Sequence, residues 1–314
     1  MRKKAIIISI KGKKLTNQEK ILLSKEKPWG IILFKRNIKS LNQIQFLINN
    51  IKKLTKDKNF PIIIDEEGST VSRLKDIINH NFSANYFGSL YLIDKKLCVQ
   101  IYKEYLNSLC KKLKMIGINF NTIPVLDIIR KKTSKVIGKR SFSNNKKIVK
   151  RLGQITVELC HKNKIISVIK HLPGHGCAIS DSHHTTPKVN LSHNKLNNID
   201  FFPFKSNSAK LAMTAHILYK KIDSENVATI SKKIIKKIIR KKIGFKGILM
   251  SDDISMRALK FDLVTNAKKS LDAGCNLALY CAGNIKDSLK LIKSVPYIDK
   301  FTSKKTSEIY KILR

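Results

Sequence analysis

The sequence is poor in acidic residues and cysteine, and it has no long apolar segment. Of its 314 residues, only 22 are Asp or Glu and 6 are Cys. No apolar run approaches the roughly 20 residues that cross a bilayer, so we expect no membrane span. The cysteines form no Cys-x-x-Cys pair and lie mostly within apolar stretches, which indicates buried thiols in a reducing compartment. We therefore expect a cytoplasmic protein.

The N-terminus has basic residues before an apolar stretch, as a secretion signal does. The stretch Ala5–Ile10 has only 6 residues, which is short of the roughly 7–15 of a signal core, and no small-residue cleavage site follows it. This segment is therefore predicted to be the first β-strand.

The excess of basic residues suggests two interpretations. The chain has 63 Lys and Arg and a formal net charge of +41. A nucleic-acid-binding protein would concentrate these residues on one face and interleave them with aromatic residues or glycines. Here Lys pairs are spread from residue 3 to residue 305, Arg is scarce, and Ile and Asn are also over-used. An AT-rich coding sequence would impose this composition, so we expect no specific nucleic-acid partner. The alternative is a basic nucleic-acid-binding protein whose affinity falls steeply with salt.

Short β-branched apolar runs alternate with longer stretches of helical spacing. We count eight such runs: Ala5–Ile10, Gly30–Phe34, Pro61–Ile64, Ile118–Val125, Ile165–Ile169, Leu211–Ala215, Gly247–Met250 and Leu277–Cys281. The predicted helices between them include Leu41–Leu54, Leu97–Ile116, Lys147–Asn163, Ser231–Ile243 and Leu263–Ala273. Runs this apolar suit parallel strands that helices cover on the outside.

Eight strand–helix units in roughly 300 residues predict an α/β fold, a TIM-type (β/α)8 barrel. No repeat or linker marks a boundary, so residues 1–314 are expected to form a single catalytic domain. An open doubly wound sheet is the alternative, but the first strand is not followed by the GxGxxG of that fold. The paired isoleucines between 234 and 243 could also belong to a membrane-surface helix. Their place between the sixth and seventh strands favours the apolar stripe of a barrel helix.

Five of the eight runs lead into ionisable residues. These are Asp65, Asp127, the pair Lys170-His171, His216 and the pair Asp252-Asp253. In a barrel, the carboxyl ends of all strands meet at one mouth, where the active site forms. The sequence therefore predicts an active site from these positions.

A long loop follows the fifth strand and holds His175, Asp181, His183 and His184. A metal site that includes His171 is one interpretation, but no helical spacing or cysteine supports it, and we expect no metal. Acid–base chemistry is the other. Residues i and i+2 of an extended segment point to the same side, so Asp181 can bond the imidazole of His183.

Six motifs together resemble those of glycoside hydrolase family 3. They are Ile64-Asp-Glu-Glu-Gly68 with Arg73, Asn119 to Asp127, Ile137-Gly-Lys-Arg-Ser-Phe142, Lys170-His-Leu-Pro-Gly-His-Gly176 with Asp181-Ser-His183, Met213-Thr-Ala-His216, and Met250 to Met256. The fourth motif is similar to that of the bacterial β-N-acetylglucosaminidases that recycle peptidoglycan. The resemblance covers about residues 5–290, with a helical extension to 314, and matches the members that consist of the barrel alone. Ser69, Thr70 and Lys139 depart from the family pattern, which puts fine substrate contacts in doubt.

The resemblance implies a β-N-acetylhexosaminidase that hydrolyses its substrate with retention. Asp252 would be the nucleophile, although the sequence does not exclude Asp253. His183 would be the acid/base, and Asp181 would orient it. The residues that would hold the N-acetylglucosamine hydroxyls are Asp65, Arg73, Arg140, Lys170 and His171. No cofactor is required, and we expect a monomer acting on a small-molecule substrate.

The expected substrate is an N-acetylglucosaminyl-1,6-anhydromuramyl peptide or the free disaccharide, cleaved in the cytoplasm. A second possibility is an enzyme of the same fold that transfers the sugar to an acceptor other than water. A histidine acid/base carries no negative charge when it acts as a base, so phosphate could attack in place of water and make the protein a phosphorylase.

Overall fold

The computed structural model describes residues 3–79, 81–131, 133–182 and 185–314. Within them, eight parallel strands close into a barrel, in the order β1-β10-β9-β7-β5-β4-β3-β2. The barrel strands are β1 (Lys4–Ile8), β2 (Pro28–Leu33), β3 (Ile62–Ile64), β4 (Phe120–Asn121), β5 (Ile166–Leu172), β7 (Leu211–Thr214), β9 (Ile248–Asp253) and β10 (Leu277–Tyr280). Each overlaps one of the eight predicted runs, so the predicted (β/α)8 barrel is confirmed.

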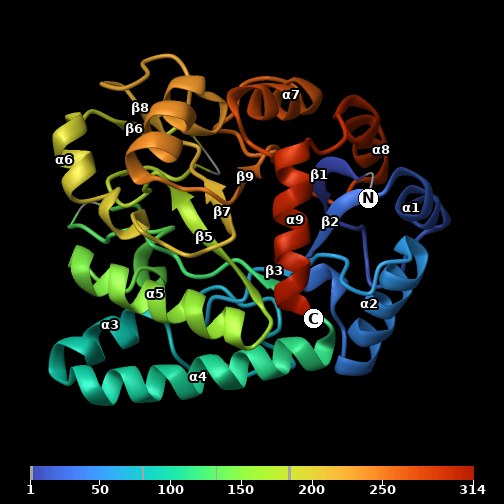
Figure 1. Ribbon diagram of the computed structural model, residues 1–314, viewed down its shortest axis with the longest axis horizontal. Helices are drawn as coiled ribbons and strands as arrows, with labels where there is room; N and C mark the ends of the chain where they lie inside the picture. Colours follow the sequence, from blue (N-terminus) through green and yellow to red (C-terminus); the bar gives the residue numbers. More distant parts are fainter. Residues whose placement is uncertain (1–2, 80, 132, 183–184) are drawn as a thin grey trace.

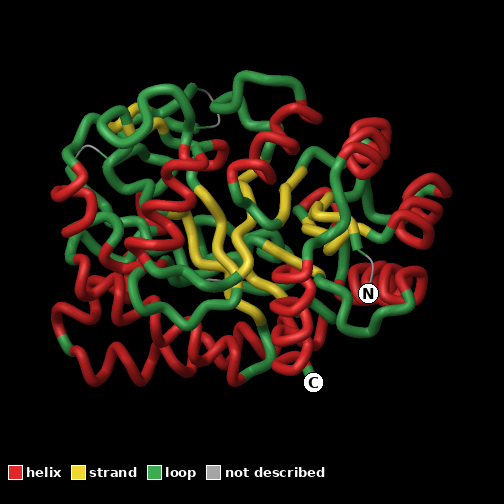
Figure 2. The backbone as a smooth tube through the Cα atoms, turned by 45° about the horizontal axis from the view of Figure 1, so that its top comes forward, coloured by secondary structure: helices red, strands yellow, loops and turns green. Residues whose placement is uncertain are grey.

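Helices surround the strands on the outside, as Figures 1 and 2 show. They are α1 (Asn17–Ile21), α2 (Leu41–Thr55), α3 (Ala84–Ile93), α4 (Lys95–Ile116), α5 (Lys146–Lys162), α6 (His193–Asn198), α7 (Leu263–Ala273), α8 (Ile285–Ser294) and α9 (Lys300–Leu313). The described residues also include two π-helical segments and four 3₁₀ turns: η1 (Leu22–Glu26), η6 (Ile234–Ile243), η2 (Lys35–Asn37), η3 (Gly138–Arg140), η4 (Phe202–Phe204) and η5 (Ala228–Ile230). In the described part of the chain, no helix is long and apolar enough to cross a membrane.

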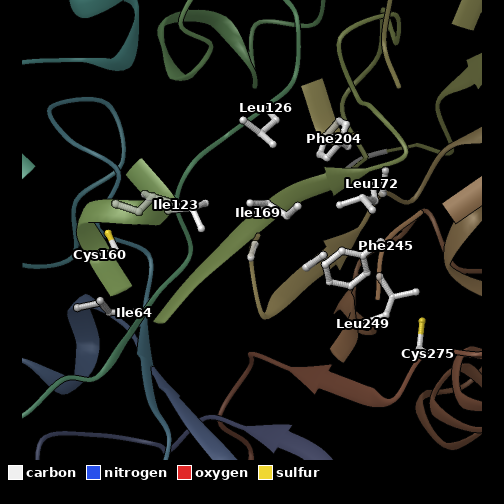
Figure 3. Close-up of a cluster of buried hydrophobic side chains, with 14 of the residues drawn as sticks. Ile64, Ile123, Leu126, Cys160, Ile169, Leu172, Phe204, Phe245, Leu249 and Cys275 are labelled. Carbon is white, nitrogen blue, oxygen red and sulfur yellow. The ribbon is translucent and has the colours of Figure 1, made fainter. Parts of the chain in front are cut away.

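Strand alternation divides the apolar side chains into two cores. Successive residues of a strand face opposite sides, so Ile7, Ile32 and Val168 fill the inside of the barrel. Their neighbours Ile6, Leu33 and Ile169 face outward and pack under the helices. Figure 3 shows part of this outer core, where Ile169 and Leu172 of β5 lie near Phe204 and Phe245. Both faces are therefore apolar, which is why the runs lack polar alternation.

The isoleucines of η6 belong to this outer core. Ile234, Ile235, Ile238, Ile239 and Ile243 are all buried, so the barrel-helix interpretation is confirmed. The element ends at Gly244 with φ +80°, and α7 ends at Gly274 with φ +115°. Both glycines adopt the left-handed conformation that a helix C-terminus favours.

Helix α9 packs against the barrel at the end where the strands begin. Its Ile309 belongs to the inner core, and Thr306 Oγ1 accepts a hydrogen bond at 2.9 Å from the indole nitrogen of Trp29, at the start of β2. Lys3, buried just before β1, donates to Asp57 at 2.9 Å and to the Tyr310 hydroxyl of α9 at 2.6 Å. These contacts join the C-terminal helix to the N-terminal strand.

Three strands differ in length from the prediction by two residues or more. One of them, β9, was predicted to end at Met250 but runs on through Asp252 and Asp253. The predicted run Ile118–Val125 contributes only Phe120–Asn121 as β4, and Pro124 has no N–H to continue a ladder. Strand β5 runs on to Leu172, so Lys170 and His171 lie within the strand rather than after it. The extension pairs with the chain after Pro124, since Leu126 N donates to the Lys170 carbonyl at 2.8 Å.

The loop after β5 has no helix from Pro173 to Leu191 in its described residues. It ends in the short strand β6 (Lys188–Val189), which pairs in parallel with β8 (Leu218–Tyr219) outside the barrel. This small sheet ties the end of the loop to the segment that follows β7.

Candidate active site

A pocket of about 410 Å³ opens at the carboxyl ends of the barrel strands. Interior residues such as Ile32, Met213 and Leu279 contribute its apolar surface. Six of the residues predicted for the site line this pocket: Asp65, Arg73, Arg140, Lys170, His171 and Asp252. The first and last of them, Asp65 and Asp252, are 187 residues apart in the chain. The closure of the barrel brings all six together.

Asp65, directly after β3, lies between two cations. Arg73 Nη2 is 2.9 Å from one carboxylate oxygen, and Lys170 Nζ is 3.4 Å from the other. Thr122 Oγ1 also donates to Asp65 at 2.5 Å. Burial alone would raise the pKa of Asp65, but Lys170 and Arg73 hold it well below its ordinary range. Asp65 is therefore a fixed negative charge that accepts hydrogen bonds.

Glu67 is a second buried carboxylate in the pocket, and the sequence analysis did not select it. Arg140 binds it with two nitrogens, at 2.7 and 2.9 Å, and Lys170 Nζ lies 2.6 Å away. Burial favours the neutral acid, but Arg140 and Lys170 prevail and lower the pKa of Glu67 to about 2. Its place in the motif Asp65-Glu-Glu67 was the available signal.

The loop that carries Arg73 is held by a neighbouring carboxylate. Glu66 is buried, and its Oε2 accepts from the backbone N–H groups of Arg73 and Leu74, both at 2.9 Å. Gly68 has φ +132° within this loop, and a Cβ there would lie 2.5 Å from the carbonyl oxygen of Phe82. A side chain at position 68 would therefore displace the loop that aims Arg73 at the pocket.

Asp127 anchors the end of β5 and the turn after it. Its carboxylate accepts from His171 Nδ1 at 2.7 Å and from the backbone N–H of His175 at 2.5 Å. The side chain is buried, and although burial favours the neutral acid, the histidines lower the pKa of Asp127 below its ordinary value. Since His171 Nδ1 carries the proton in this bond, its Nε2 is the nitrogen available to the pocket. Asp127 was predicted at a strand end, and its role in holding His171 and His175 appears only in the structure.

Asp252 and Asp253, at the end of β9, have different partners. Asp253 accepts from Ser255 N and Oγ at 3.0 and 2.7 Å and from Cys281 N at 3.2 Å. It therefore holds the turn after β9 and the end of β10. Asp252 accepts from the Asp253 backbone N–H at 2.8 Å. This difference favours Asp252 as the reacting carboxylate and Asp253 as its structural neighbour.

Histidines surround Asp252 and keep it ionised. Burial would raise the pKa of Asp252, but His216 and His171 lower it below its ordinary value. His216 Nε2 donates to the carbonyl oxygen of Asp253 at 2.9 Å, while its Nδ1 pairs with Thr229 Oγ1 at 2.7 Å. His216 is thus held between β9 and the segment after β7, close to the carboxylate that it influences.

The predicted acid/base pair is only partly covered by the described residues. His183 and His184 lie outside them. Asp181 is partly buried, and the next residue, Ser182, lines the pocket. Among the described residues, no group of three or more His, Cys, Asp or Glu side chains is arranged to hold a metal ion.

The three departures from the family pattern lie at the surface. Ser69, Thr70 and Lys139 are exposed, and of these only Thr70 lines the pocket. The carboxylates and cations of the pocket therefore do not depend on these three side chains.

Comparison with known proteins shows the class that this fold and site define. Residues 2–307 match the family described as "Glycosyl hydrolase family 3 N terminal domain", so the chain belongs to glycosyl hydrolase family 3. A β-hexosaminidase of Haemophilus influenzae is 33% identical over 304 residues, which is 93% of this chain and 85% of that protein. A β-hexosaminidase of Actinobacillus succinogenes is 32% identical over 305 residues, covering 94% and 87%.

Solved structures agree with these relatives. NagZ from Neisseria gonorrhoeae, determined in complex with N-trifluoroacetyl-D-glucosamine, superimposes with a TM-score of 0.89 at 29% identity. The superposition covers 98% of this chain and 90% of that one. The predicted enzyme class, a β-N-acetylhexosaminidase of this family, is confirmed.

The low pKa of Glu67 predicts how the stability depends on pH. The folded-state pKa of about 2 lies below the ordinary 4.5, so the ion pairs of Glu67 stabilise the fold above pH 4.5 and lose that contribution as the pH falls toward 2. Glu67→Gln should therefore cost about 3 kcal/mol near pH 7. Urea unfolding at several pH values measures this, and the difference from wild type should shrink below pH 4.5. Glu308→Gln, at an exposed pair of α9, is the control and should change stability little. A penalty at Glu67 that does not depend on pH would contradict the assignment.

Proposed function

We propose that the protein is a retaining β-N-acetylglucosaminidase of peptidoglycan recycling. It removes terminal β-linked N-acetylglucosamine from 1,6-anhydromuramyl peptides or from the free disaccharide, as a monomer in the cytoplasm. The observation that carries this proposal is the position of Asp252, a half-buried carboxylate of lowered pKa in a pocket where Arg73, Arg140 and Lys170 each pair with another carboxylate. The proposal is also supported by the similarity of this chain to the β-hexosaminidases and to the sugar-bound NagZ structure described above.

The charged groups of the pocket suit a polyhydroxylated ring. Asp65 and Glu67 offer acceptors, and Lys170, Arg73 and Arg140 offer donors, already fixed by their ion pairs. Because these groups are oriented before substrate arrives, they need little reorganisation to hold the hydroxyls. We assign hydroxyl binding to Asp65, Arg73, Arg140, Lys170 and His171, as in the family.

Two displacements would complete the reaction. The Asp252 carboxylate attacks the anomeric carbon as the bond to the leaving oxygen breaks, and His183 gives that oxygen a proton. The resulting neutral imidazole then takes a proton from water, which attacks the glycosyl-enzyme and releases Asp252. Asp181 would stabilise the imidazolium and orient the ring. The loop that carries both residues also contributes Ser182 to the pocket, so it belongs to the site at least in part.

Replacing the nucleophile should abolish formation of the glycosyl-enzyme. Asp252→Ala should lower kcat by several orders of magnitude, because no other carboxylate would then be positioned to attack. A 2-fluoro-sugar trap followed by peptide mass spectrometry should label the peptide that contains Asp252 in the wild type. A label on Glu66 or Glu67 would move the chemistry to the end of β3 and disprove the assignment.

Loss of the acid/base should depend on the leaving group. His183→Ala should lose far more activity on the natural disaccharide than on a nitrophenyl glycoside, whose phenolate departs with little help from an acid. Asp181→Asn should show a milder form of the same pattern. Comparing kcat/KM for the two substrates measures this.

His184→Ala is the matched control for the loop, since alternation would point residue 184 away from residue 183. A leaving-group-dependent defect at 184 rather than 183 would show that the acid/base had been assigned one residue away. Equal losses on both substrates at 183, together with inactivation of the wild type by a chelator, would indicate a metal ligand instead.

The product distinguishes hydrolysis from phosphorolysis. Lys170, Arg140 and Arg73 each pair with a carboxylate, so the pocket does not present these cations to a phosphate ion. We therefore expect N-acetylglucosamine in both phosphate and phosphate-free buffer, measured by anion-exchange chromatography. N-acetylglucosamine 1-phosphate as the main product in phosphate would identify a phosphorylase.

A further inference from the structure

A second pocket, of about 340 Å³, lies beside the loop after β5 and contains none of the residues assigned to the reaction. Its walls come from three segments: the end of the loop after β5, the segment after β7 that includes β8, and the turn after β9. Strands β5, β7 and β9 are neighbours in the barrel, and each wall follows the carboxyl end of its strand. The second pocket therefore lies at the same end of the barrel as the pocket that holds Asp252, which we call the sugar pocket.

The two pockets adjoin one another. Ser182 lines the sugar pocket and Thr185 the second pocket, and in the same way Met256 lines the first and Ala258 the second. Three residues of extended chain span at most about 11 Å, and two span about 7 Å. Thr186 Oγ1 donates to the Ala258 carbonyl at 3.1 Å, which joins the two segments that separate the pockets. A ligand with a short peptide attached is therefore long enough to reach from one pocket to the other.

Contacts within the protein hold two walls of the second pocket in place. The N–H of Leu218 in β8 donates to the Pro187 carbonyl at 2.9 Å, next to the pairing of β6 with β8. In the segment after β8, the Asp223 carboxylate accepts from the N–H groups of Glu225 and Asn226 at 3.1 and 3.0 Å. These walls keep their shape without a ligand, which lowers the entropy cost of binding one.

The second pocket combines apolar and charged surface. Its lining includes the buried side chains of Leu218 and Val227 and the exposed side chains of Lys188, Lys260 and Glu225. Between described residues, no ion pair within 4.0 Å involves any of these three charged groups. The two lysines thus differ from the cations of the sugar pocket, which carboxylates already occupy, and they are available to an anionic group of a ligand.

The leaving group of the proposed reaction is the part of the substrate nearest to this pocket. The proton donor must stand next to the leaving oxygen, and position 183 falls in the chain between Ser182 of the sugar pocket and Thr185 of the second pocket. The leaving group therefore starts at the edge of the sugar pocket that borders the second one. A peptide on that leaving group ends in a free carboxylate, which the two lysines can bind, and apolar parts of the peptide suit the buried side chains.

We propose that the second pocket binds the peptide of a muropeptide substrate, on the leaving-group side of the reaction, and that Lys188 and Lys260 recognise its carboxylate. The inference rests on the proposed function, since it takes a peptide-bearing substrate and a proton donor at position 183. The pocket contributes to the choice of substrate, while the chemistry stays in the sugar pocket.

The test compares two substrates that differ only in the peptide. They are N-acetylglucosaminyl-1,6-anhydromuramyl tripeptide and the free disaccharide, and the ratio of their kcat/KM values does not depend on how much of a variant is folded. The double variant Lys188→Ala/Lys260→Ala should lower this ratio about 2- to 20-fold, as expected for two exposed charge pairs. Lys188→Arg/Lys260→Arg keeps both charges and should retain most of the ratio.

The double variant Lys20→Ala/Lys53→Ala is the matched control. Both lysines are exposed, and they line a separate pocket beside α1 and α2. The control removes the same two charges from a chain of high net charge, so any general attraction of the protein for an anionic substrate changes equally. Its ratio should equal that of the wild type.

Two results would overturn the proposal. One is a Lys188→Ala/Lys260→Ala enzyme with the wild-type ratio, and the other is a ratio that falls equally in the control. Failure of the proposed function looks different: the wild type would cleave a nitrophenyl N-acetylglucosaminide but neither anhydromuramyl substrate. An enzyme that cleaves both anhydromuramyl substrates with an unchanged ratio in every variant would retain the proposed function and lose only the peptide site.

Discussion

The ammonium group of Lys170 connects the parts of the active site. Its side chain is 3% exposed and lies within reach of both Asp65 and Glu67, at 3.4 and 2.6 Å. Two carboxylates close enough to share one ammonium group would repel one another in a buried pocket, and the cation between them offsets that repulsion. The two carboxylates in the loop after β3 thus depend on a residue of β5 that comes about 100 positions later. Arg73, from the same loop, and Arg140, from η3, complete the balance.

This network explains how a chain of such strong positive charge has an electrostatically balanced pocket. The formal net charge is +41, yet the deep cations of the site each pair with a carboxylate. Buried pairs of this kind are screened little by salt, whereas the exposed lysines are screened strongly. The lysine-rich surface can therefore vary with little effect on the field at Asp252. Lys139, exposed beside Arg140, illustrates how a departure in sequence leaves the paired groups in place.

Asp127 supports the other half of the pocket. By accepting from both the His171 ring and the His175 backbone, it fixes the orientation of the first imidazole and the start of the loop after β5. The same loop carries Asp181 and the predicted acid/base. The groups proposed to act on the substrate are thus held by buried groups with no such proposed role, as preorganised sites require.

The barrel and most of the candidate site could be predicted from sequence patterns. Eight β-branched runs, each apolar on both faces, were enough to predict eight covered parallel strands. The helices predicted to end at Ile243 and Ala273 do end there, each directly before a glycine of positive φ. Asp65, Lys170, His171 and Asp252 could be selected because strand ends converge in any barrel. Which groups pair across the mouth of the barrel could not be predicted in this way and follows from the three-dimensional arrangement. Glu67 and Asp127 gain their roles from Arg140, Lys170 and His171. Distances between side chains of different strands follow from barrel closure and loop path, and a local sequence pattern records neither.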